Sequence, residues 1–173
     1  TKIREVVRNY LEKGIQDIAM LKYKKENMYF LNNVTKVVEE VYREFGLEYN
    51  NYIEIKQLSS SCRKITISLY ADNSNIIIDE HYSTISTRII MGQNHPNFGK
   101  ITDSSLYIGS NTTSENDFAI FTYNSHSNIK IGNNCWIGSG VVFLDGAEIG
   151  DGCVVAANSV VTKKFESNIV IGG

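Results

Sequence analysis

The sequence of 173 residues has little proline and cysteine and no long apolar run. It contains one proline, three cysteines and three histidines, and nothing close to the roughly 18 apolar residues of a membrane span. Its 17 basic and 19 acidic residues leave a formal net charge of -2. These absences argue against a membrane span, a secretory signal, and nucleic acid or an anionic membrane as the main partner. We therefore expect a cytoplasmic protein.

The three cysteines are Cys62, Cys135 and Cys153. They are odd in number and have no metal-ligand spacing, which is typical of a reduced, intracellular chain. Cys135 and Cys153 are separated by three six-residue repeats, and each stands where the repeated pattern places small residues. Packing is enough to explain both, so we expect neither a disulfide nor a catalytic thiol.

Residues 1–50 are predicted to form a helical N-terminal segment. Apolar residues recur at helical spacing from residue 2 to about 21. A second helix is expected to begin at Asn32 or Asn33 and to end at Gly46. Its apolar face would hold Val34, Val37, Val38, Val41, Tyr42 and Phe45. This segment would cover the open end of the region that follows, extend the wall of a site, or mediate assembly.

Residues 51–173 are predicted to be mainly β. Short β-branched runs such as "YIEIKQL", "KITISLY" and "NIIIDE" alternate with Asn, Asp, Ser and Gly. Further on, one large apolar residue stands at every sixth position: Ile131, Ile137, Phe143, Ile149, Val155 and Val161. Because a strand alternates sides, this period means that each short strand buries one large side chain before the chain turns.

Three such turns close a triangle, so the pattern returns to the same face after every third repeat. We expect Ile131 to stack on Ile149, Ile137 on Val155 and Phe143 on Val161, with parallel pairing between coils. Half of the residues that follow the large ones are glycine, namely Gly132, Gly138 and Gly150. These glycines are expected to take the unusual backbone angles of the corners.

With the stretch "IGNNCWIGSGVVFLDGAEIGDGCVVAANSVVTK", the chain from about Asn73 to Gly173 resembles the hexapeptide-repeat acyltransferases, in their xenobiotic and sugar O-acetyltransferase branch. The resemblance implies a left-handed parallel β-helix of triangular coils. It also implies acetyl-CoA as co-substrate, and a homotrimer with active sites between subunits. The expected activity is acetyl transfer to a sugar or saccharide hydroxyl, as in polysaccharide modification.

Acetyl transfer from a thioester to a hydroxyl needs a base for the hydroxyl proton, and histidine suits this task at neutral pH. The branch has a histidine in a "G-x-N-H" stretch; here "GQNH" supplies His95, 41 positions before Trp136, with Asn94 as a substrate contact. The chain then departs from the branch, because "ITDSSLY" replaces the usual Ser-Thr or Thr-Thr pair and Pro-Phe. His126 is the alternative base or a substrate contact, and His81 is interpreted as a partly exposed corner residue.

The resemblance also suggests where coenzyme A binds. Its pantetheine arm would lie along small residues of the late coils, and lysines near the last coil would meet its phosphates. Backbone amides near Ser139 or Gly140 are the expected oxyanion donors. The indole of Trp136 either packs beside the substrate or covers the outside of the prism. The residues expected to bind coenzyme A are Trp136, Gly138, Ser139, Ala156, Ala157, Ser159, Lys163 and Lys164. No residue is assigned as a metal ligand.

The acceptor is not defined by the sequence, and its pocket is expected to be built by active-site loops at 92–107 and 110–128. Alternatives are a hydroxylated antibiotic of the chloramphenicol or streptogramin type, or a sugar or serine N- or O-acetyltransferase of another hexapeptide branch. A non-enzymatic β-helix scaffold is a further alternative. A metal-binding relative like the γ-type carbonic anhydrases would need three histidines brought together, whereas the unequal gaps between His81, His95 and His126 do not match stacked coils.

Overall fold

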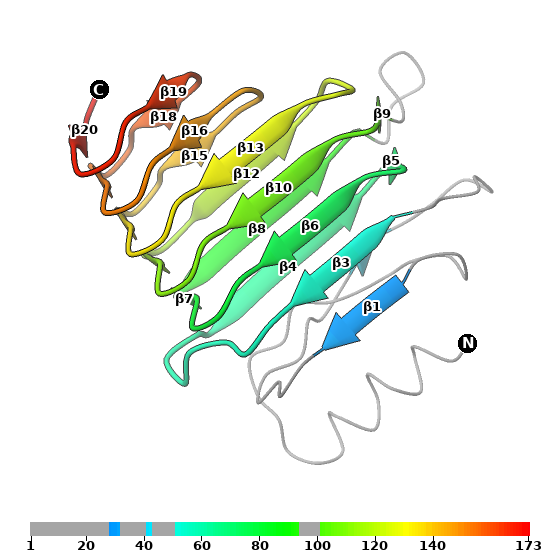
Figure 1. Ribbon diagram of the computed structural model, residues 1–173, viewed down its shortest axis with the longest axis horizontal. Helices are drawn as coiled ribbons and strands as arrows, with labels where there is room; N and C mark the ends of the chain where they lie inside the picture. The colour runs from blue at the N-terminus through cyan, green and yellow to red at the C-terminus, as the bar shows by residue number, and fades with distance from the viewer. Residues whose placement is uncertain (1–27, 32–40, 43–50, 94–100) are drawn as a thin grey trace.

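The computed structural model describes residues 28–31, 41–42, 51–93 and 101–173. Within them the regular structure consists of β-strands joined by short turns, wound into stacked coils (Figure 1). All strand pairs between coils are parallel, as the pairs of β3, β10 and β14 illustrate. The fold is the predicted left-handed parallel β-helix, and the helix prediction for residues 1–50 falls mostly outside the described residues.

The strands form three sheets, one on each face of the prism. The first face holds β1 (Met28–Leu31), β3 (Tyr52–Ile55), β6 (Asn75–Ile78), β10 (Ser105–Ile108), β13 (Asn128–Ile131), β16 (Glu148–Ile149) and β19 (Lys164–Phe165). The second face holds β7 (Ser83–Thr84), β11 (Thr113–Ser114), β14 (Trp136–Ile137), β17 (Val154–Val155) and β20 (Val170–Ile171). The third face holds β2 (Val41–Tyr42), β4 (Lys64–Leu69), β8 (Ser86–Met91), β12 (Phe118–Thr122), β15 (Val142–Phe143) and β18 (Val160–Val161).

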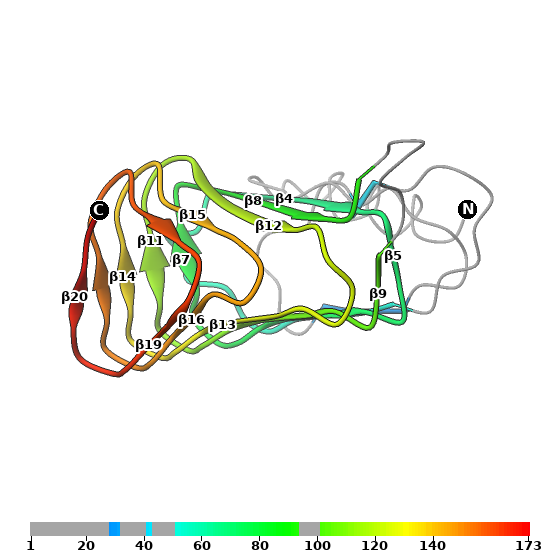
Figure 2. The same cartoon turned by 90° about the horizontal axis from the view of Figure 1, so that it is seen from above.

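The coils are wide at the N-terminal end of the prism and narrow toward its C-terminal end. In a wide coil Asn75 pairs with the distant Ser105, whereas in a narrow coil Ile131 pairs with Ile149, which is much closer along the chain. The extra residues lengthen the strands of the third face and add a fourth wall made of β5 (Ala71–Asp72) and β9 (Ile101–Thr102). Figure 2 shows this wall at the end of the wide coils opposite the second face.

Two edges of the prism matter for the site. We call the edge between the second and third faces the front edge, because the chain turns there directly from β14 into β15 and from β17 into β18. The edge between the third and first faces, which the β5–β9 wall occupies in the wide coils, is called the back edge. The strands of the third face span the distance between them.

The predicted stacking of large apolar residues is confirmed. Strand pairing places Ile131 on Ile149, Ile137 on Val155 and Phe143 on Val161 in successive coils, and all six side chains are buried. At the transition to the wide coils, Phe143 meets Phe118 edge to face, with 5.4 Å between ring centroids. The narrow coils therefore share one continuous apolar core with the wide ones.

The second N-terminal helix is corrected at two of its residues. Val41 and Tyr42 form β2 and pair in parallel with Ile67 and Ser68 of β4. The helical spacing of the valines predicted a helix at these two residues. They form a strand instead, because β-branched and aromatic residues also favour strands and β4 offers a backbone edge to pair with. Likewise β1, within the segment predicted as helical, pairs with β3.

The glycines after the large residues do not serve the expected purpose. The left-handed corner residues lie two positions further on, as at Asn134 (φ 56°) and Gly152 (φ 68°). Gly132 is needed for a different reason, since a Cβ there would lie 2.6 Å from the backbone nitrogen of Asp151 in the next coil. Glycine at this position lets neighbouring coils approach each other.

The expectation of irregular loops at 92–107 and 110–128 is wrong where the described residues form strands, and residues 94–100 lie outside the described part. They contain β9, β10, β11 and β12, which are regular parts of the wide coils. Two features hid these strands: their coils are longer than three six-residue repeats, and the inward positions include polar Thr112, Ser114 and Thr122. The described residues outside strands here are mainly short turns such as 123–127.

We expect Phe143→Ala to lower the free energy of unfolding by about 3–5 kcal/mol, because it opens a cavity beside Phe118 in a fully buried position. Val160→Ala is the matched control: the outward-facing Val160 is 53% exposed, and its loss should cost less than about 0.5 kcal/mol. Urea unfolding of both variants measures the difference. Similar losses in the two variants would contradict the inward and outward assignment.

Candidate functional site

Four predicted coenzyme residues lie together on the front edge. Gly138 and Ser139 follow β14, and Ala156 and Ala157 follow β17 one coil later. The coils are so close here that a Cβ on Gly138 would lie 2.7 Å from the backbone nitrogen of Ala157. We call these four residues the small-residue strip. Because no long side chain stands in the way, an extended ligand could approach the backbone along it.

Trp136 lies at the end of this strip, on the outer surface of the second face. Its side chain is 46% exposed, and its Nε1–H donates a hydrogen bond of 3.2 Å to Oε1 of Glu115 in the preceding coil. Trp136 precedes Gly138 by two residues on the same strand and turn. The exposed indole therefore covers the outside of the prism and also stands beside the strip, so both interpretations of it remain open.

The remaining predicted coenzyme residues are not part of the strip. Ser159 is 2% exposed, and its hydroxyl has no hydrogen-bond partner in the described part of the chain. Lys163 and Lys164 lie on the back edge, after β18. Lys164 pairs with Glu148 at 2.8 Å, and the Lys163 ammonium lies 5.4 Å from the ring centroid of Phe165.

His95 and Asn94 lie outside the described residues. The described residues on either side of them are anchored on the back edge. There, the N–H of Gly92 donates to the carbonyl of Thr122 at 2.7 Å, and the N–H of Ile101 donates to that of Tyr70 at 3.2 Å. The role of His95 as a base and that of Asn94 as a substrate contact both stay predictions.

His126 also lies on the back edge, one coil after Asp103. It is a left-handed corner residue (φ 57°) with a side chain that is 75% exposed, and its Nδ1 lies 3.9 Å from Oδ2 of Asp103. Asp103 in turn accepts hydrogen bonds from Nδ2 of Asn73 and from Oγ1 of Thr102. Corner side chains of three successive coils thus form a column of amide, carboxylate and imidazole. At 3.9 Å the carboxylate is beyond hydrogen-bond distance of Nδ1, so it acts on the imidazole through its charge, which favours a proton on Nδ1 and leaves Nε2 as the basic nitrogen.

The turn that carries His126 is firmly attached to the next coil. The carboxylate of Asp145 accepts hydrogen bonds from the N–H of Tyr123 at 3.0 Å and from Nδ2 of Asn124 at 3.1 Å. The N–H of His126 donates to the carbonyl of Thr102 at 2.9 Å. Tyr123 is exposed and stacks on Phe121, with 5.8 Å between ring centroids. The turn therefore presents an aromatic ring and an imidazole from a fixed backbone.

His81 is an exposed corner residue, as the sequence indicated. It has φ 62°, and its N–H donates to the carbonyl of Gln57 at 2.6 Å, on the edge between the first and second faces. His81 and His126 therefore lie on different edges, and the chain does not bring them together. The described residues contain no group of three His, Cys, Asp or Glu side chains arranged to hold a metal ion.

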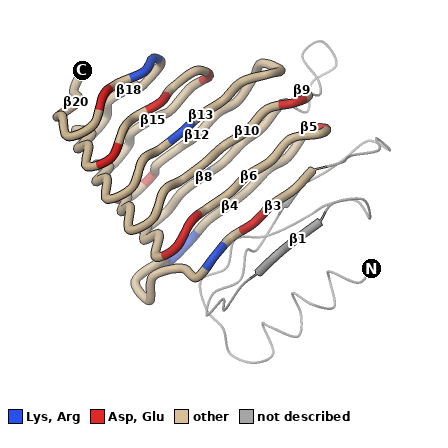
Figure 3. The backbone as a smooth tube through the Cα atoms, viewed as in Figure 1, with Lys and Arg blue, Asp and Glu red and all other residues tan. Residues whose placement is uncertain are grey.

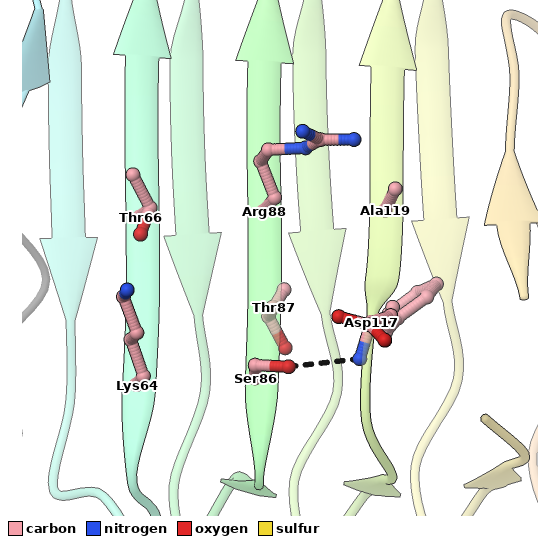
Figure 4. A pocket seen from close by; sticks show the side chains of 8 residues that line it. Lys64, Thr66, Ser86, Thr87, Arg88, Asp117 and Ala119 are labelled. Atoms are coloured by element: carbon pink, nitrogen blue, oxygen red, sulfur yellow. Dashed lines mark hydrogen bonds between the residues drawn. The ribbon is translucent and has the colours of Figure 1, made fainter. Parts of the chain in front are cut away.

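Two surface grooves flank the front edge in the wide coils, and the sequence analysis missed both. The first has a volume of about 310 Å³ and lies on the outer surface of the third face (Figure 4). It is lined by Lys64, Thr66, Ser86, Thr87, Arg88, Asp117, Phe118 and Ala119. The N–H of Asp117 donates to Oγ of Ser86 at 2.8 Å across this groove.

The second groove has a volume of about 490 Å³ and lies on the side of the second face. It is lined by Ser60, Ser61, Arg63, Ser83, Thr84, Ile85, Thr113, Ser114 and Glu115. Glu115 links this groove to Trp136. No local motif marks these residues, because they come from three coils of unequal length. Figure 3 shows that charged residues are scattered over the described coils, so charge does not single them out either.

His126 and the small-residue strip lie on opposite edges of the third face. Each of β4 and β8 has six residues, which corresponds to about 20 Å of extended strand between the edges. His126 of one chain is therefore held away from the strip of the same chain.

The described fold agrees with a comparison to known protein families. Residues 128–163 match the family "Bacterial transferase hexapeptide (six repeats)". The galactoside O-acetyltransferase of Escherichia coli is 53% identical over 45 residues, which are 26% of this chain and 22% of that protein. A chloramphenicol acetyltransferase of Klebsiella aerogenes is 38% identical over 55 residues, 32% of this chain and 26% of that protein. No solved structure is a significant match.

These matches bear out the predicted resemblance to the hexapeptide-repeat acyltransferases. The family match, over residues 128–163, includes the small-residue strip. The named relatives are acetyltransferases and therefore use an acyl donor. The matched stretch spans only about a quarter of the length of each of these relatives. No helix among the described residues is long and apolar enough to cross a membrane.

All three cysteine side chains are buried. Burial raises the pKa of the Cys135 thiol, which makes the reactive thiolate scarcer at neutral pH. We expect no reaction of Cys62, Cys135 or Cys153 with dithiobis(nitrobenzoic acid) in the folded protein and reaction of all three in guanidinium chloride. Absorbance of the released thiolate measures both. Rapid reaction of one thiol in the folded protein would contradict its purely structural role.

Proposed function

We propose that this protein is an acetyl-CoA-dependent O-acetyltransferase that acts in the cytoplasm on a sugar or saccharide hydroxyl. The observation that supports this most is the small-residue strip of the front edge. Ser139 and Ala157 are exposed there beside the closely packed Gly138 and Ala156, within the residues 128–163 that match the hexapeptide transferase family. One of those relatives is named for a galactoside, which favours a saccharide acceptor.

A second candidate acceptor is a hydroxylated antibiotic, because relatives of similar coverage are named chloramphenicol acetyltransferases. The comparisons do not separate the two candidates, because enzymes named for both acceptors match this chain over similarly short stretches.

Acetyl-CoA would lie along the front edge, with its pantetheine arm over the small-residue strip. The indole of Trp136 would then pack beside the thioester end of the arm. Lys163 and Lys164 lie on the back edge of the same chain, so they would meet coenzyme phosphates only where another subunit's front edge approaches.

We propose a homotrimer with active sites between subunits. The back edge carries His126 and the anchors of the segment with His95, whereas the front edge carries the strip. A ring in which each back edge faces a neighbour's front edge joins the two halves of the site three times. Each subunit would then contribute to two active sites, one at its front edge and one at its back edge, separated by the width of its third face.

In the proposed reaction, a histidine takes the proton of the acceptor hydroxyl while the oxygen attacks the thioester carbonyl. The tetrahedral oxyanion then collapses and expels the coenzyme A thiolate, which receives the proton from the imidazolium. The N–H of Gly140 is already bonded to the carbonyl of Asn116 at 2.9 Å. The N–H of Ser139 has no acceptor among the described residues, so it is the better oxyanion donor of the two.

The test of this function is release of coenzyme A from acetyl-CoA, with a panel of sugars, oligosaccharides, chloramphenicol and serine as acceptors. We expect turnover with a saccharide, and a loss of kcat of about 100-fold or more when the base is replaced by alanine. The sequence resemblance favours His95 as that base; the neighbouring carboxylate of Asp103 favours His126.

The kcat values of His95→Ala and His126→Ala therefore show which histidine is the base. His81→Ala, on another edge of the prism, is the matched control. If His126 is the base, Asp103→Asn should also lower kcat with little change in KM, because the amide favours the wrong tautomer. If no acceptor gives turnover and acetyl-CoA does not bind, the proposed activity is wrong and the protein is better described as a non-enzymatic β-helix scaffold.

The path of the coenzyme is tested by Ala157→Leu. A large side chain on the strip should raise the KM for acetyl-CoA roughly tenfold and leave the acceptor KM unchanged, because it blocks the approach to the backbone. Glu166→Leu, at an exposed corner away from the front edge, is the control. An unchanged KM for acetyl-CoA in Ala157→Leu would remove the strip from the coenzyme site.

A further inference from the structure

The groove beside the second face is built from two parallel columns of side chains. The first column holds Ser61, Ser83 and Thr113: Oγ of Ser61 hydrogen-bonds Oγ of Ser83 at 2.7 Å, and Ser83 pairs in register with Thr113. Thr113 pairs in turn with Trp136, which closes the column. Coils repeat at about 4.8 Å, so the hydroxyls and the indole follow one another at the spacing of neighbouring strands.

The second column runs beside the first and holds Arg63, Ile85 and Glu115. The N–H of Arg63 donates to the carbonyl of Thr84, and that of Ile85 donates to the carbonyl of Ser114, which places the three residues in successive coils. Ile85 is 38% exposed between the two charged residues. The groove therefore offers hydroxyls along one side and a cation, an apolar surface and a carboxylate along the other.

The two charges in this groove are not equally available. The carboxylate of Glu115 accepts the hydrogen bond of the Trp136 indole. The guanidinium of Arg63 is exposed and has no ion pair or hydrogen bond with any other described residue. An incoming ligand thus meets, at one end of the hydroxyl column, a cation that no described side chain pairs with, and at the other end an exposed indole.

We propose that this groove binds the acceptor, and that the acceptor is an anionic oligosaccharide. The inference rests on the proposed function and adds its substrate class. A sugar carboxylate would pair with Arg63 in the bidentate geometry that guanidinium favours. Ring hydroxyls, which donate and accept, match Ser61, Ser83 and Thr113, which do the same.

The order of groups along the groove places the reacting ring. Trp136 is the point where the groove meets the small-residue strip, so the ring that receives the acetyl group lies against the indole, where its C–H face packs. Arg63 is three coils from Trp136, or about 14 Å. The carboxylate therefore belongs to a different ring of the chain from the one that is acetylated, and a single sugar acid does not span the site.

The experiment measures saccharide binding to the full chain by isothermal titration calorimetry, without acetyl-CoA. The probes are trigalacturonic acid and sialyllactose, each with an uncharged counterpart, maltotriose and lactose. We expect an acidic probe to bind, its neutral counterpart to bind roughly tenfold more weakly, and Arg63→Gln to abolish that preference. Arg88→Gln is the matched control, since Arg88 is an exposed arginine on the neighbouring face, outside this groove.

Two further variants distinguish the effect of the Arg63 charge on saccharide binding from effects on the fold. Thr113→Val keeps the side-chain shape and removes one hydroxyl of the column, so it should weaken both the acidic and the neutral probes. Arg63→Lys keeps the charge without the planar fork, so it should restore part of the preference. Circular dichroism checks that every variant melts at the wild-type temperature.

The proposal is overturned if neither acidic probe binds, or if Arg63→Gln and Arg88→Gln affect binding equally. Titration of acetyl-CoA into the same samples tests the proposed function separately. If acetyl-CoA binds and no saccharide does, the groove is not the acceptor site, and the proposed acetyltransferase function is unaffected. Saccharide binding without acetyl-CoA binding refutes the acetyltransferase, and the groove with it as an acceptor site.

Discussion

Parallel backbone pairing between coils is the interaction on which the rest of this structure depends. A strand inside a sheet bonds to its equivalent one coil earlier and one coil later, so its residues have fixed neighbours about 4.8 Å away along the prism. Inward positions become continuous apolar columns, and outward positions become rows of surface chemistry. Side chains far apart in sequence, such as Ser61, Ser83 and Thr113, become adjacent for this reason alone.

Where coil length is constant, the sequence was enough to predict this pairing. From Ile131 to Val161 the period is six, and the stacking inferred from it matches the structure residue for residue. In the wide coils the length varies and some inward residues are polar. Tyr82, Thr84, Thr87 and Ser114 bury four hydroxyls that satisfy one another at 2.6–3.3 Å. A pattern search that expects one large aliphatic residue every six positions does not find such coils.

The sequence was enough to predict which residues are candidates for the site, but not where they lie relative to one another. Small residues near Gly138 and Ala156 follow from the repeat, because their positions relative to the large residues are fixed. Whether His126 lies near them is decided by the width of the coils, which the sequence does not reveal. The corner slot of His126 is held by Asn73 and Asp103 in earlier coils, so a sequence argument also could not separate a corner residue from a base. Only the stacked column shows that a carboxylate stands beside the imidazole.

The buried hydroxyl cluster connects the core of the wide coils to the proposed acceptor groove. Thr84 and Ser114 belong to the cluster and also line the groove, so the cluster forms its floor. Burial raises the pKa of Tyr82 to about 12, against the hydrogen bonds from its neighbours, so the phenol stays neutral and keeps bonding to Thr87 and Ser114. An aliphatic core would pack these coils as well, but it would leave nothing polar at the base of the groove that we propose for the acceptor. The hydroxyl cluster inside the wide coils thus lies beneath the hydroxyl column on their surface, whereas the narrow coils, which would hold only the donor, bury the single hydroxyl of Ser159 and no such cluster.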